Sequence, residues 1–195
     1  DLSLRGSGDI FGSSQAGFVD SVGVSLYTKM IEDELKKIKG EYVFEEDDDE
    51  KTLINIDTHI EDNYVNDEDI KIEIHKLINE IDSYDKLVEI KSIIEDRFGK
   101  ISVKTEDYMY EEWFEKIAKK LGIKKVLQTD RMVQIDLPKE LSNKVKGDKL
   151  LYNALSISNN FKLSYRHEII SITLFYKNLP EHFVRYLVRL LNTLV

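Results

Sequence analysis

The chain of 195 residues contains no cysteine. Without thiols it forms neither disulfides nor thiolate metal sites, and it has no cysteine nucleophile. It has only two prolines, and no apolar run approaches the roughly 20 residues that a transmembrane helix needs. These absences predict a protein without a membrane span, and the missing cysteines fit a cytoplasmic location.

Negative charge outweighs positive charge, with 37 Asp or Glu against 28 Lys or Arg and a formal net charge of -9. Residues 41–69 hold thirteen Asp or Glu against one Lys, whereas residues 70–195 hold twenty-two Lys or Arg against eighteen acids. The acidic run Glu45–Glu50 repels itself, which is typical of a solvated linker. The sequence has no concentrated basic stripe of the kind that DNA backbone binding requires. We therefore expect this chain alone to bind duplex DNA weakly.

Motifs for catalysis and metal binding are missing as well. The sequence has no HExxH zinc motif, no nucleophile elbow and no phosphate-binding loop. Residues 57–69 are acidic but lack the sixth-position glycine of a calcium loop, and the third glycine after Gly6 and Gly8 comes one residue late for a dinucleotide fingerprint. The four histidines do not have ligand spacing and are expected at the surface or at its rim: His59, His75, His167 and His182. We predict no catalytic residue, no metal site and no cofactor in this chain.

Hydrophobic spacing predicts a largely helical first half. An apolar stripe runs from Val22 to the glycine at position 40, and residues 52–60 alternate like a half-buried strand. Three further helices are expected, one from about Asp67, one capped by Ser83 and ending at Gly99, and one ending at Gly122.

The second half has a different pattern. Residues 123–127 and 132–137 predict one hairpin, and residues 161–165 and 169–175 predict another. Pro138 opens a short helix, further helix lies around residues 150–155, and an amphipathic helix spans 179–194. The predicted class is α+β: a helical N-terminal half with one lead-in strand, then a small, mostly antiparallel sheet of two hairpins packed with helices.

The opening stretch carries one arginine, one glutamine and four glycines at a specific spacing: Arg5, Gly6, Gly8, Gly12, Gln15 and Gly17. With their neighbours they resemble the end of the translocation motif shared by RecG-type helicases and transcription-repair coupling factors. In such motors the arginine and glutamine couple ATP hydrolysis to movement on duplex DNA. The resemblance implies a parent motor that uses ATP and Mg and contacts DNA through domains outside this chain. The chain begins with Asp1, which favours a piece of a longer protein.

Later segments favour the coupling factors over the RecG-type proteins, which end soon after the motif. Residues 22–30 resemble the V-G-F-x-L-Y segment of the coupling factors, residues 90–99 resemble their E-L-x-D-R-F-G helix end, and residues 121–125 resemble their L-G-I-R-K segment. The expected organisation is a motor remnant at 1–40, an acidic linker at 41–51 and a C-terminal regulatory α+β domain at 52–195.

The resemblance implies a function. A coupling factor is an ATP-dependent DNA translocase that displaces stalled RNA polymerase and recruits UvrA. Its terminal domain docks on a UvrB-like module of the same chain and masks the UvrA-binding surface. Asp96 and Arg97 match the charged contacts of this clamp; Ile93 stands where an acid is expected, and Glu95 is a candidate substitute. An alternative interpretation stays open, in which Asp96 and Arg97 only form a salt bridge at the end of the helix.

The sequence is also compatible with two other functions. One is an independent protein-binding adaptor with no motor attached. The other is an enzyme with an unrecognised site, which requires a deep pocket lined by converging ionisable groups with perturbed pKa values.

Overall fold

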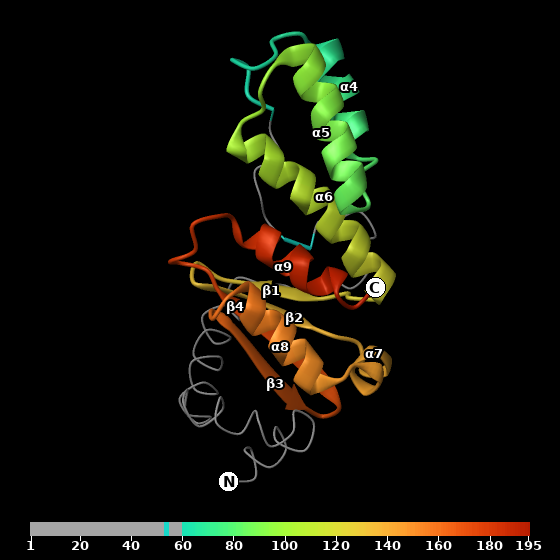
Figure 1. The fold of residues 1–195 in the computed structure, drawn as a ribbon, viewed down its shortest axis with the longest axis vertical. Coiled ribbons are helices and arrows are strands. Elements are labelled where there is room, and N and C mark those ends of the chain that lie inside the picture. The colour runs from blue at the N-terminus through green and yellow to red at the C-terminus, as the bar shows by residue number, and fades with distance from the viewer. Residues whose placement is uncertain (1–52, 55–59) are drawn as a thin grey trace. The chain divides into compact units, whose positions relative to one another are not determined.

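The structure, a computed structural model, describes residues 53–54 and 60–195 (Figure 1). The described residues belong to two compact units. The helical unit holds residues 53–124 and 179–195, and the sheet unit holds residues 125–178. The predicted helix after residue 22, the acidic linker and most of the lead-in strand lie outside the described residues.

The helical unit contains α4 (Glu68–Ile78), α5 (Tyr84–Phe98), α6 (Val103–Leu121) and α9 (Phe183–Asn192). Helices α4, α5 and α6 contact one another, and α9 packs against α6 (Figure 1). A side-chain oxygen caps the N-terminus of three of these helices. Asp67 accepts from the amide of Asp69, Ser83 from that of Lys86 and Ser102 from that of Thr105. Such capping satisfies amides that have no partner within the helix. The predicted starts at Asp67 and Ser83 are confirmed.

Apolar stripes from the first three helices form the core of this unit. Ile74 and Ile78 of α4, together with Phe114 of α6, are fully buried. The stripe of α5 consists of Leu87, Ile90 and Ile94 and is equally buried. The spacing of three or four residues explains why one face of each helix faces the core while the other stays in water.

The sheet unit contains β1 (Val126–Gln128), β2 (Met132–Asp136), α7 (Lys139–Lys144), α8 (Gly147–Ile157), β3 (Phe161–Arg166) and β4 (Ile169–Phe175). The strands form one antiparallel sheet in the order β1-β2-β4-β3. Helix α7 contacts β4 and α8 contacts β3. The predicted α+β class and both hairpins are confirmed.

The first strand begins later than expected. Gly122 ends α6 in the left-handed region at φ 76, and the amide of Ile123 donates to the carbonyl of Ala118 over 2.8 Å. This pattern closes a helix C-terminus. Because the amide of Ile123 is bonded to α6, the pairing of β1 with β2 starts only at Val126.

The closing helix is shorter than its apolar pattern suggested. Residue 179 precedes α9 and residue 194 follows it. His182 precedes the first turn, and its Nδ1 accepts from the amide of Val184 over 3.1 Å. Among the described helices, none is long and apolar enough to cross a membrane.

Candidate functional site

The three residues predicted for the clamp lie at the C-terminal end of α5, and their side chains have different surroundings. Asp96 and Arg97 are exposed, whereas Glu95 is half-buried. Because consecutive helical residues point about 100° apart, the three side chains leave the helix in separate directions. The structure therefore assigns each of them a different environment.

Arg97 bridges two helices. Its Nη1 and Nη2 donate to Oε1 and Oε2 of Glu73 on α4, the second over 3.3 Å. Its guanidinium carbon lies 4.8 Å from the centre of the Phe98 ring. The hydrogen bonds raise the pKa of Arg97 and lower the pKa of Glu73, so the pair stays ionised. The salt bridge of Arg97 thus runs to α4 and not to Asp96.

Glu95 has a local structural role. Its Oε2 accepts from the backbone amide of Ile101 over 3.1 Å, which fixes the loop between α5 and α6. The same carboxylate contributes to raising the pKa of Tyr64, after burial, and the Tyr64 hydroxyl donates to the carbonyl of Gly99. A carboxylate held by its own loop is less available to a partner protein than an exposed one.

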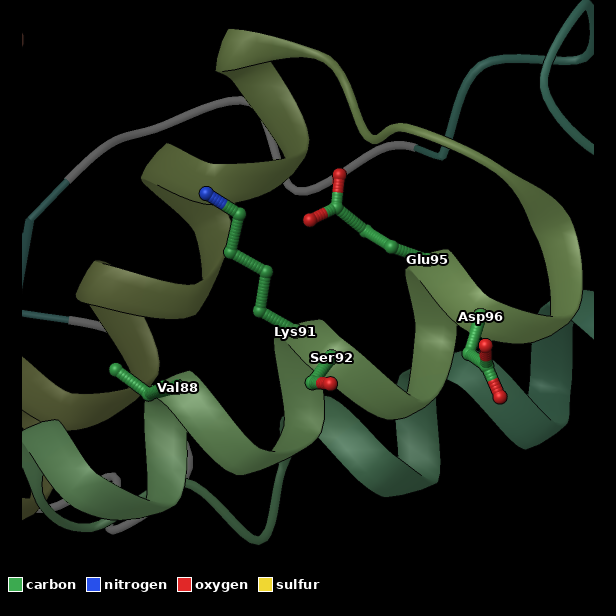
Figure 2. A pocket seen from close by; sticks show the side chains of 5 residues that line it. All are labelled: Val88, Lys91, Ser92, Glu95 and Asp96. Atoms are coloured by element: carbon green, nitrogen blue, oxygen red, sulfur yellow. The ribbon is translucent and has the colours of Figure 1, made fainter.

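A shallow hollow of about 460 Å³ lies along α5 beside these residues (Figure 2). It is lined by Val88, Lys91, Ser92, Glu95 and Asp96. Figure 2 shows the side chains of Lys91 and Glu95 on one side of the helix and that of Asp96 pointing away from them. Lys91 forms an ion pair with Glu106 of α6 at 3.3 Å. The hollow is therefore open and mixed in charge, which suits protein contact better than chemistry on a small molecule.

The strongest pKa shifts lie elsewhere, on α6. Burial raises the pKa of Glu111 to about 8, with Glu112 and Glu115 adding to the shift, and Oε2 of Glu111 has no hydrogen-bond partner among the described residues. Burial also raises the pKa values of Glu112 and Glu115. None of the three carboxylates lines the hollow on α5. Among the described residues, these three carboxylates and the hollow on α5 are thus separate features.

Metal ligands do not gather in the part of the chain that the structure describes. No three His, Asp or Glu side chains lie close enough there to hold an ion. The six residues of the predicted translocation motif, from Arg5 to Gly17, lie outside the described residues.

Residues 54–147 match the family model described as TRCF domain. These residues are therefore similar to a TRCF domain. The matched stretch includes the whole of α5, so Asp96 and Arg97 lie within it.

Relatives agree with this assignment. The transcription-repair-coupling factor of Staphylococcus haemolyticus (strain JCSC1435) is 27% identical over 175 residues, which cover 89% of this chain and 15% of that protein. That of Staphylococcus aureus (strain USA300) is 26% identical over 190 residues, covering 97% of this chain and 16% of that protein. The chain thus spans about a sixth of the length of these relatives.

A solved structure supports the fold. The crystal structure of the C-terminal domain of a transcription-repair coupling factor matches with a TM-score of 0.59 at 20% identity, covering 73% of this chain and 89% of that chain. The predicted resemblance to this C-terminal domain is confirmed.

Sequence reasoning missed two partners of Arg97. Phe98 follows Arg97 directly in the sequence, so the stacking contact had a visible signal. Glu73 had none, because it lies 24 residues earlier on another helix and becomes a neighbour only when α4 packs on α5.

Proposed function

We propose that this chain is the non-catalytic regulatory C-terminal region of a transcription-repair coupling factor. In the proposal the longer protein is an ATP-dependent DNA translocase, with ATP and Mg in its motor domains, that displaces stalled RNA polymerase and recruits UvrA. The region docks on the UvrB-like module of the same protein and masks its UvrA-binding surface. The observation that carries the proposal is an exposed Asp96 beside a fixed Arg97 on one helix of the TRCF domain.

The geometry supports docking for a physical reason. Arg97 is held by Glu73 and Phe98, and the neighbouring Asp96 is exposed, with no ion-pair partner among the described residues. Opposite charges at defined positions along a helix select partners with a complementary pattern and penalise others. A regulatory contact needs only a docked and an undocked state separated by a few kcal/mol.

The direct test mixes the 195-residue chain with the separately expressed UvrB-like module and measures binding by calorimetry at several salt concentrations. We expect saturable binding that weakens with salt, and a loss of at least about fivefold for Asp96→Lys or Arg97→Glu. Asp148→Lys, an exposed charge reversal on α8, is the matched control and should bind like the wild type. Because the untethered contact lacks the effective concentration of a single chain, the titration must reach millimolar protein.

Masking has its own test. Saturating amounts of the chain should reduce UvrA binding to the same module, and Arg97→Glu should restore it. If the chain binds the module without reducing UvrA binding, the chain acts as an adaptor and not as an autoinhibitory clamp. ATP turnover that copurifies with the wild-type chain would contradict the non-catalytic assignment.

A further inference from the structure

The ion pair between Arg97 and Glu73 makes the candidate surface a property of two helices. Both side chains are about half exposed, at 47% for Arg97 and 46% for Glu73, so the pair lies at the surface and not in the core. The pair therefore orders a side chain that a partner can reach.

Two contacts fix the guanidinium plane. Glu73 receives the Nη1 and Nη2 hydrogen bonds, and the Phe98 ring lies beneath the guanidinium carbon. A guanidinium has five N–H donors, so the carboxylate of Glu73 leaves donors over for a second acceptor. The planar fork also keeps a defined direction when one edge is bound.

Ordering before binding improves affinity. A long side chain that becomes fixed only on docking loses rotamer freedom at that moment, and the loss weakens the complex. Arg97 has lost much of that freedom already, because Glu73 and Phe98 hold it in the free chain.

From this geometry we infer that Glu73 of α4 is a positioning residue for Arg97, so the docking contact of α5 depends on a side chain of α4. The inference rests on the proposed function, since it concerns the same contact with the UvrB-like module. Glu73 acts through Arg97 and does not itself bind the partner. The sequence resemblance places no role at Glu73.

A double-mutant cycle tests the inference. Binding of the UvrB-like module is measured for the wild-type chain, Glu73→Ala, Arg97→Ala and the double variant. We expect Glu73→Ala to weaken binding by roughly two- to tenfold, the range for one side chain that must be ordered on binding. In the Arg97→Ala background the same change should have no effect, because no guanidinium remains to be positioned. Glu73→Gln, which keeps one acceptor oxygen, should lie between wild type and Glu73→Ala.

Controls separate positioning from folding. Lys139→Ala removes an exposed ion pair with Glu168 in the sheet unit and should bind like the wild type. Thermal unfolding of all variants should stay close to that of the wild type, since the changes are on the surface.

The outcomes separate the inference from the proposed function. A loss of binding for Arg97→Ala with none for Glu73→Ala overturns the positioning role alone. Tighter binding for Glu73→Ala also overturns it, because Glu73 would then compete with the partner for Arg97. Equal losses from Glu73→Ala in the wild-type and Arg97→Ala backgrounds overturn it too, because Glu73 would then contact the partner directly. If Arg97→Ala itself binds like the wild type, or the wild type does not bind, the proposed docking fails and the inference with it.

Discussion

Arg185 of α9 donates a hydrogen bond from Nε to Oδ1 of Asp107 of α6 over 2.7 Å, and both side chains are nearly buried. The guanidinium also lies 4.9 Å from the centre of the Tyr110 ring, and its Nη1 is 3.3 Å from Glu181 and 3.5 Å from Glu106. One side chain thus joins α9 to α6 through charge, hydrogen bonding and an aromatic contact.

Replacing Arg185 by alanine should destabilise the chain by about 2–4 kcal/mol, because Asp107 then stays buried without its cation. Urea unfolding followed by circular dichroism measures the change. The double variant Arg185→Met with Asp107→Leu should recover most of the loss, since it removes both charges and restores apolar packing. If the double variant is no more stable than Arg185→Ala, the stabilising effect of Arg185 does not come from its pairing with Asp107.

Glu111 predicts a pH dependence of stability. Burial raises its pKa to about 8 in the folded chain, against roughly 4.3 for an unfolded glutamate. Between these values the folded state holds the extra proton, so the contribution of Glu111 to stability is lost as the pH rises toward 8. Glu111→Gln cannot ionise and should exceed the wild type in stability by more than about 1 kcal/mol at pH 8, the equivalent of one pKa unit. The gain should shrink at pH 5.

Glu140→Gln, at an exposed position of α7, is the control for the pH series and should follow the wild type at every pH. A constant difference between Glu111→Gln and the wild type from pH 5 to pH 8 would show that Glu111 does not titrate in this window.

The turn between β3 and β4 contains two non-glycine residues at positive φ, His167 at 52° and Glu168 at 63°. Two-residue hairpin turns of this kind favour Asn-Gly, because side chains with a Cβ are strained there. Changing His167 to Asn together with Glu168 to Gly should raise stability by about 1 kcal/mol, measured as a higher midpoint of thermal unfolding. The exposed ion pair of Glu168 with Lys139 is lost in this variant, so Lys139→Ala is the control. An unchanged midpoint would mean that the turn is not strained.

Ser142 joins α7 to β4 inside the sheet unit. Its Oγ accepts from the amide of Ile170 over 3.0 Å and donates to the carbonyl of Leu137 over 3.2 Å. Ser142→Ala leaves a buried amide without a partner and should cost about 1–3 kcal/mol. Ser156→Ala, which removes an exposed hydroxyl bonded to the carbonyl of Tyr152, should cost much less. Similar losses for the two variants would contradict a special role for the buried bond.

Much of the fold was predictable because its signals are local. Ser83 and Gly99 lie at the ends of α5 as their types and spacing predict, and alternating residues marked both hairpins. The predicted start of the first strand was wrong because the pattern at residues 123–127 does not show which hydrogen bonds the backbone makes. The amide of Ile123 donates to the last turn of α6 and is therefore unavailable to β1.

The candidate site was predictable only in part. The sequence marked Asp96 and Arg97 through a family pattern and offered Glu95 as a candidate contact, but it gave no sign that the Glu95 carboxylate accepts from the Ile101 amide. The partnership of Arg97 with Glu73 depends on how two helices pack, which no local pattern encodes. The burial of Glu111 was not predictable for the same reason, since the packing of other elements decides which side of α6 is shielded from water.

The hydrogen bond between Asp107 and Arg185 joins residues 78 positions apart, with the entire sheet segment between them. On a ribosome, which delivers residues in order, α6 must therefore emerge long before the helix that covers its Asp107 side chain. During that interval α4, α5 and α6 form an incomplete helical unit whose last partner is still to be translated. Chaperones bind and proteases cleave such incomplete units, because their apolar surface is still exposed. A premature stop before α9 should therefore release a chain that is degraded.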